Sequence, residues 1–312
     1  MTTDAIHDVP TPNSQATSQP PAARNVSPGQ RFFWAIRREL WEFRSIYLAP
    51  VVAGGLFFFT FALSSIHFAR KMRDALTLDG ARQHSMFTPY DMVAGLMMLT
   101  MMIVGTFYCL DALYGERRDR SILFWKSMPV SDTMTVMAKA SIPFFVLPLV
   151  VFAVAAVTET LMLLVNGAEL AVSGGSLESL WMHLSLPRML LLLLYHLFMA
   201  HVLWHAPFYA WFLLVGAWAR RTPFLWAFMP PVLLCFVEKI IFGTTHFLGA
   251  LQFRLNGDGM DVLMTHGNFP IDPMTQMTPF RYMGSPGLWS GLALTALFLA
   301  LAVRLRRIRG VI

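Results

Sequence analysis

The sequence predicts an all-α integral membrane protein with six transmembrane helices and an amphipathic helix at the membrane surface before the first of them. Of the 312 residues, 56% are hydrophobic and 13% are charged, about half the charged share of ordinary soluble domains. A bilayer core is spanned by about 20 apolar residues in a helix. Six such runs occur, at 46–68, 91–113, 141–166, 189–218, 223–242 and 287–305. A soluble core is excluded, because six buried helices would leave too little polar surface.

The chain begins with a polar segment that precedes the membrane domain. Residues 1–28 are rich in Pro, Ser, Thr, Ala and Gln and lack the apolar core of a signal peptide. We expect this tail to be disordered, and residues 29–312 to form one six-helix membrane domain. The segment 30–45 carries apolar residues at helical spacing, which predicts a helix lying along the interface. These residues are Phe33, Ile36, Leu40 and Phe43.

The distribution of basic residues predicts the orientation. If the N-terminus is cytosolic, 16 of the 24 lysines and arginines lie on that side. The positive-inside rule therefore favours both termini on the cytoplasmic side, and we expect the protein in the plasma (inner) membrane. Arg70, Lys71 and Arg73 follow the first span and lie on the wrong side for this rule. The net charge of +6 is not gathered in a patch with interleaved aromatic residues, so we expect no nucleic-acid partner.

The second and third spans each contain a carboxylate. Thr88 and Pro89 match a helix start, which predicts that the second span begins there. Asp111 lies near the cytosolic end of this span, where we expect it to pair with an arginine of the interfacial helix. Glu159 lies near the outer end of the third span. A carboxylate within a span is costly and marks a candidate functional position, although partial hydration of Glu159 is the alternative.

The fourth span holds three histidines. At 1.5 Å per residue, 189–218 would be about 45 Å long, and Pro207 predicts a kink within it. His201 and His205 share one helix face at a spacing that suits zinc, but the glutamate of a His-Glu-x-x-His motif is missing. We therefore expect no metal or haem, and place these side chains with His196 at helix interfaces or along a pathway.

Two connecting segments stand out. The outer loop 243–286 is the longest connection and is too long for a simple turn. The loop 115–132, between the second and third spans, is dense in charge and contains a short amphipathic run ending at Pro129. Ser131 and Asp132 can then cap the next helix. A short rigid helix held between two spans can transmit a mechanical force, and this is one interpretation of the loop. The alternative interpretation is a peripheral loop that lies in the membrane interface.

The loop resembles the coupling loop of permease subunits of ABC-2 type transporters. That family commonly shows Glu-Arg-x-x-Gly-Thr-Leu-x-x-Leu-x-x-x-Pro-Val-Ser here. The corresponding residues of this chain are Glu116, Arg117, Ser121, Leu123, Pro129, Val130 and Ser131. The chain departs from the pattern at Arg120, where glycine is usual, and at Ser121, where threonine is usual. The layout of an interfacial helix, six spans and a long outer loop before the last span is similar too.

This resemblance implies a type-2 ABC exporter-like permease that moves an unidentified substrate. The chain contains no Gly-x-x-x-x-Gly-Lys-Ser/Thr motif, so a separate ABC ATP-binding subunit would bind ATP and Mg and hydrolyse ATP. The chain itself would then be no enzyme and would hold no cofactor. Since six spans make half of an exporter, a second permease copy is implied, as a homodimer in the lipid bilayer.

The same resemblance assigns the contact with the ATP-binding subunit to the loop. The residues implied are Glu116, Arg117, Arg118, Ser121, Leu123, Phe124, Trp125 and Pro129. Two other classes stay open at this stage. One is a non-transporting membrane scaffold or mechanotransmission subunit of an ABC complex. The other is a membrane-embedded enzyme using His201 and His205, for which no catalytic set is visible. Fold alone does not identify a cargo.

Overall fold

The computed structural model describes residues 27–76, 80–123, 130–172, 185–256 and 279–308, and the regular elements within them are all helices. Six of these helical segments are long and apolar enough to cross a membrane. The predicted class of an all-helical multi-pass membrane protein is therefore confirmed. The predicted disorder of the N-terminal tail falls almost wholly on residues 1–26, which lie outside the described part.

The N-terminal helix α1 (Pro28–Glu42) starts at a capping box. The Ser27 hydroxyl accepts from the backbone N–H of Gln30 at 3.3 Å, and the Gln30 side chain accepts from the N–H of Ser27 at 3.2 Å. One face of α1, with Ile36 and Leu40, packs on the bundle. The opposite face exposes aromatic rings, and Arg37 lies over Trp34 and Trp41, at 5.0 and 4.7 Å. This outward face suits the headgroup layer of a membrane.

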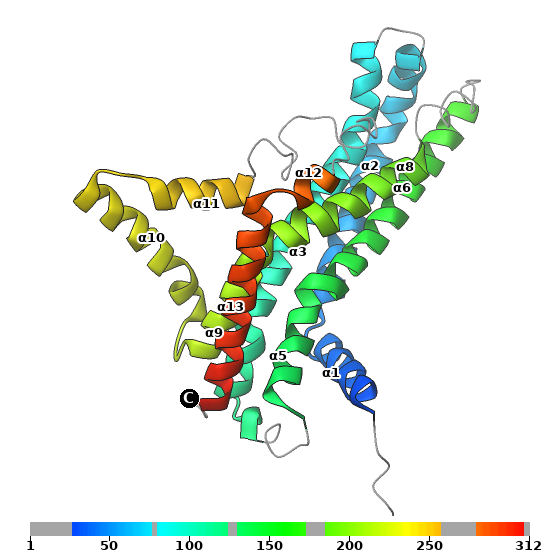
Figure 1. Ribbon diagram of the computed structural model, residues 1–312. Helices are drawn as coiled ribbons and strands as arrows, with labels where there is room; N and C mark the ends of the chain where they lie inside the picture. The colour runs from blue at the N-terminus through cyan, green and yellow to red at the C-terminus, as the bar shows by residue number, and fades with distance from the viewer. Residues whose placement is uncertain (1–26, 77–79, 124–129, 173–184, 257–278, 309–312) are drawn as a thin grey trace, which may run out of the picture.

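The bundle is built from the first four spans and the last one. Helix α2 (Ser45–Leu76) packs on α3 (Gly80–Arg118) and α6 (Leu147–Val172), while α3 also packs on α9 (Trp204–Trp218). The last helix, α13 (Pro286–Ile308), lies along α9 (Figure 1). The apolar span is found at Thr88–Arg118 as predicted, but the helix start predicted at Thr88 and Pro89 is wrong, because α3 begins at Gly80. Proline costs a helix one backbone hydrogen bond, and α3 continues through Pro89 despite that loss.

The third and fourth spans each contain a π-helical segment. In the third, α5 (Asp132–Ser141) and α6 are joined by η1 (Ile142–Val146), and in the fourth, α8 (Leu186–Tyr195) and α9 are joined by η2 (His196–Leu203). The segments η1 and η2 contact each other. The sequence predicts a kink at Pro207 in the fourth span. The helix instead departs from α-helical geometry a few residues earlier, in η2, and Pro207 lies inside α9. Single π-helical turns occur often at functional positions.

The fifth span leans away from the bundle. Helix α10 (Pro223–Phe242) buries almost none of its residues, and Figure 1 shows α11 (His246–Asn256) returning from its far end toward α13. The Glu238 carboxylate closes the turn between them by accepting from the N–H groups of His246 and Phe247 at 2.7 and 2.8 Å. The described part of the predicted outer loop thus contains α11 and the short α12 (Pro279–Met283).

The arrangement predicts that Ser27 and Ile308, the first and last described residues, lie on one side of the membrane, since α1 and the end of α13 lie at the same end of the bundle (Figure 1). In intact cells, a membrane-impermeant thiol reagent should label Thr245→Cys but neither Ser27→Cys nor Ile308→Cys, and it should label all three after lysis. The native thiols are poor targets, because Cys109 is buried and Cys235 lies inside a span. Labelling of the two end positions alone in intact cells would reverse the orientation.

Candidate functional site

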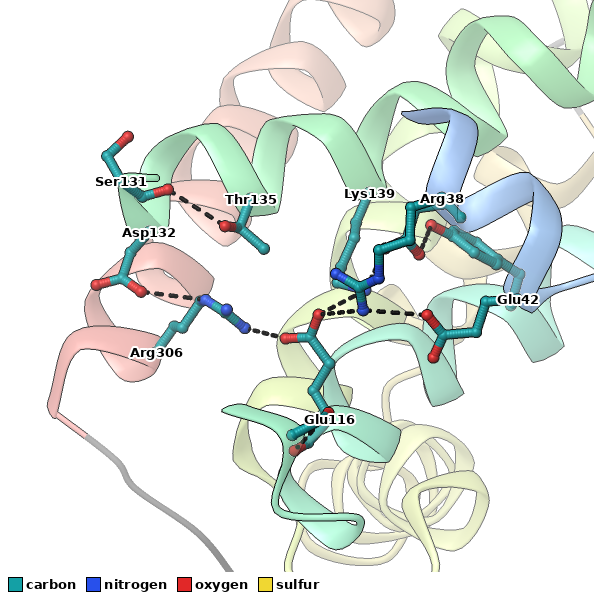
Figure 2. A network of polar contacts seen from close by, with 11 residues as sticks. Arg38, Glu42, Glu116, Ser131, Asp132, Thr135, Lys139 and Arg306 are labelled. Atoms are coloured by element: carbon teal, nitrogen blue, oxygen red, sulfur yellow. Dashed lines mark hydrogen bonds and ion pairs between the residues drawn. The ribbon is translucent and has the colours of Figure 1, made fainter. Parts of the chain in front are cut away.

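The most unusual feature of the molecule is a cluster of buried charges at the end of the bundle where α1, α3, α5 and α13 meet (Figure 2). We call this cluster the charged network and the end of the bundle that holds it the network end. Its members are Arg38, Glu39, Glu116, Asp132, Lys139 and Arg306. Charged side chains are rarely buried unless they are paired, so a cluster of this size is a candidate functional element.

Glu116 lies at the centre of the charged network. Its side chain is 1% exposed, and it is held by cations from three other helices. Lys139 of α5 lies 3.2 Å from one carboxylate oxygen, and Arg38 of α1 donates to the same oxygen at 3.3 Å. Arg306 of α13 donates to the other oxygen. The last residues of α3 are thereby tied to the N-terminal helix α1 and to the third and sixth spans.

Glu39 is the second carboxylate at the centre of the charged network. Its carboxylate accepts from Lys139 Nζ at 2.8 Å through one oxygen and from the Tyr108 hydroxyl at 2.9 Å through the other. Sequence reasoning missed Glu39, although a signal was present. Glu39 follows Ile36 by three residues and precedes Phe43 by four, so it lies on the face of α1 that packs on the bundle. A carboxylate on an apolar face calls for a buried cationic partner.

Arg306 connects the last span to the start of the third. Its Nε donates to Asp132 Oδ1 at 3.1 Å, while its Nη1 bonds to Glu116. Asp132 lies in the first turn of α5, where a carboxylate is also favoured by the helix dipole. The predicted cap of this helix is confirmed, because the Ser131 hydroxyl accepts from the N–H of Met134 at 3.1 Å.

Arg117 joins the fourth span to the same end of the bundle. Its Nη1 donates to the carbonyl oxygens of Ala217 and Ala219, at 2.7 and 3.1 Å. Those carbonyls belong to the end of α9, where a cation satisfies acceptors that the helix leaves unpaired. Gly216 brings the two helices close, since a Cβ there would lie 2.9 Å from the Leu110 carbonyl oxygen.

Beyond Arg118 the chain turns sharply. Arg120 has a φ of 58°, in the left-handed region that glycine adopts without penalty. The backbone thus takes this conformation where the ABC-2 pattern has glycine. Ser121 then donates to the Glu116 carbonyl at 3.4 Å, Ile122 is fully buried, and Leu123 is 61% exposed. The other expected contact residues, Phe124, Trp125 and Pro129, lie outside the described part of the chain.

The charges expected to face a partner are divided between the interior and the surface. Glu116 and Arg117 are buried and engaged within the chain. Arg118 is exposed and donates to Asp119 at 2.9 Å, and this hydrogen bond lowers the pKa of the Asp119 carboxyl. Arg118 also lies 4.0 Å from Asp111. The expected pairing of Asp111 with an arginine of α1 is therefore replaced by one within α3.

The remaining polar candidates lie inside the bundle. Glu159 is 2% exposed, and its Oε2 has no hydrogen-bond partner among the described residues. His201 Nε2 lies 3.1 Å from the Tyr209 hydroxyl, and the Nδ1 atoms of His196 and His205 each face a backbone carbonyl one turn back, at 2.8 and 3.0 Å. Within the described ranges, no group of three or more His, Cys, Asp or Glu side chains is placed to hold a metal.

Comparison with family models, curated proteins and solved structures finds no match to this chain. The charged network and the loop that it holds are therefore the features of the molecule that bear on its function.

We expect Glu116→Gln to destabilise the protein by up to roughly 3–5 kcal/mol, the usual cost of breaking a buried ion pair, because Lys139 and Arg306 each lose one carboxylate partner and keep Glu39 and Asp132, respectively. The matched control is Glu42→Gln, which removes an exposed partner of Arg38 and should cost about 0.5 kcal/mol. Thermal unfolding of the purified protein in detergent measures both. The double variant Glu116→Gln/Lys139→Met should cost less than the two single changes together, and strict additivity would contradict a shared network.

We expect the purified protein to contain no stoichiometric zinc or haem, because the ligands beside His201 and His205 are incomplete. Elemental analysis measures the zinc content, and visible absorbance the haem content, of the wild type and of His201→Asn/His205→Asn. The double variant should lose the contact with Tyr209 and keep the same metal content. One metal ion or haem per chain that disappears in the variant would restore the enzyme hypothesis.

Proposed function

We propose that this chain is the transmembrane permease subunit of an ABC exporter and that residues 115–132 receive the force of ATP hydrolysis from a separate ATP-binding subunit. The observation that carries the proposal is the charged network directly behind that loop. Glu116 enters the network where α3 ends and Asp132 where α5 begins. Both ends of the loop are therefore anchored in the same set of ion pairs.

This anchoring supports a role in transmitting force. A push on the exposed turn around Leu123 acts on α3 and α5 together, because Arg306 bonds to both Glu116 and Asp132. Lys139 and Arg38 pass the same displacement to α1. A loop held in this way moves whole helices, whereas a loop anchored by exposed ion pairs would yield locally, since such pairs contribute little.

The proposal includes the assembly and the location. A second copy of the chain completes the transport unit as a homodimer in the plasma (inner) membrane, and the network end faces the cytoplasm, where ATP is available. The ATP-binding subunit holds ATP and Mg. The exposed aromatic face of α1, with Trp34 and Trp41, suits a helix lying in the cytoplasmic headgroup layer.

Replacing Phe124 and Trp125 together by alanine should weaken binding of the ATP-binding subunit by roughly tenfold or more, because buried aromatic groups dominate such interfaces. The matched control is Phe280→Ala/Trp289→Ala, which removes two exposed aromatic side chains near the opposite end of the bundle. The affinity-tagged permease is co-expressed with an ATP-binding protein encoded beside it. Co-purification and vanadate-sensitive ATP hydrolysis are then measured.

The loop variant should lose co-purification and stimulated hydrolysis together while eluting as a monodisperse species, and the control should keep both. Full co-purification and full stimulation in the loop variant would refute the coupling role of the loop. If the loop variant still co-purifies with the ATP-binding subunit but no longer stimulates ATP hydrolysis, the loop would act in the transmission of force and not in binding.

A further inference from the structure

A cavity of about 530 Å³ lies between α9, α10, α11 and α13, in the part of the molecule where α10 leans away from the bundle. Figure 1 shows α10 and α11 as two sides of a triangle whose third side is the bundle. The walls are almost entirely apolar, and include Pro207, Trp211, Pro231, Leu234, Phe247 and Phe298. This volume is in the range of cavities that hold small molecules.

One charged side chain, Arg254 of α11, lines this cavity among the described residues. Its guanidinium lies 4.6 Å over the Trp204 ring, and its Nη2 donates to the Gly287 carbonyl at 2.6 Å. The packing around it is tight, since a Cβ added at Gly291 would lie 2.5 Å from that Nη2. The residue at 291 must therefore be glycine for the guanidinium to occupy this position.

The guanidinium of Arg254 is held in place, but no carboxylate among the described residues neutralises its charge. Its contacts among the described residues are the Trp204 ring and the carbonyl oxygens of Trp204 and Gly287, and none is a carboxylate. A guanidinium has five N–H donors, so donors remain after these bonds. Partial burial lowers the pKa of Arg254, which reflects the cost of holding its charge in an apolar place. A partly buried charge in apolar surroundings is stabilised by an opposite charge.

We infer that the cavity binds an anionic amphiphile, with an acyl chain against the apolar walls and an acidic headgroup on Arg254. The planar fork of a guanidinium matches a phosphate or carboxylate group in two-point contact. Arg254 lies beside Gly287, near the start of α13, whereas the charged network lies near the end of that helix. The amphiphile would thus come from the leaflet opposite the charged network. This site exists whether or not the chain works with an ATPase.

Photolabelling of the whole chain in vesicles tests this site. The chain is reconstituted in phosphatidylcholine with a small fraction of phosphatidylglycerol that carries a diazirine on its acyl chain. Phosphatidylcholine with the same diazirine is the neutral probe. After irradiation, mass spectrometry locates the label. The anionic probe should label residues around Leu234, Phe247 and Phe298 roughly tenfold more than the neutral probe, the ratio expected for one charge-assisted contact.

Two variants separate the contribution of the Arg254 charge to binding from the contribution of the cavity volume. Arg254→Gln should lower labelling by the anionic probe about tenfold, to the level of the neutral probe. Leu234→Trp fills the cavity and should lower labelling by both probes. The matched control is Arg188→Gln, which removes a partly buried arginine of α8 outside the cavity lining and should change nothing. Free inorganic phosphate should not compete with the anionic probe for the cavity, because phosphate has no acyl chain.

Equal labelling by the two probes would overturn the inference, as would unchanged labelling in Arg254→Gln. Cross-links between two copies of the chain at the cavity would show that a helix of the second copy fills it. Competition by free phosphate would reduce the site to simple anion binding and would also overturn the inference. If Arg254→Gln aggregates, the comparison of the two probes on the wild type and on Leu234→Trp decides the outcome.

Discussion

A carboxylate buried among helices has to be neutralised, and that requirement at Glu116 organises one end of this molecule. Its side chain is almost fully buried, and its three cationic partners come from α1, α5 and α13. None of these pairs is strongly favourable by itself, since desolvation offsets most of the attraction between buried charges. Their combined effect is geometric: each charge is satisfied only when all four helices meet in one arrangement. Glu39 adds to this constraint, because it shares Lys139 with Glu116.

The two ends of the bundle are stabilised by different forces, and this difference has functional consequences. At the network end, directional ion pairs and the bonds of Arg117 to the end of α9 specify how the helices are placed. At the other end, α11 contacts the bundle mainly through apolar packing around Trp204 and through one cation, Arg254. Apolar contacts are non-directional. In the proposed function, the first end receives the force, and the cavity at the second end accommodates the proposed amphiphile.

Between the two ends, the third and fourth spans are interrupted by η1 and η2, which contact each other. The wider turns of a π-helix change the direction in which side chains point. His201 lies in η2 and faces Tyr209 one turn into α9. Glu159 is another buried polar group inside the bundle, and it belongs to α6 beyond η1. Glu159 thus lies on a different span from His201 and Tyr209, and among the described residues no hydrogen bond joins it to either of them.

Composition and periodicity were sufficient to predict the helical membrane class, the six spans and the amphipathic helix α1, because a bilayer accepts only segments that satisfy their own backbone hydrogen bonds. Local chemistry also predicted the cap at Ser131, which depends on residues three positions apart. The start of α3 was misplaced, since a proline tolerated inside a helix looks the same in sequence as one at its start. The pairing of Glu39 and Glu116 with Lys139, the bonds of Arg117 to α9 and the position of Arg254 over Trp204 could not be predicted. Each joins residues at least 23 positions apart in the chain, and only the packing of the helices decides which buried charge meets which partner.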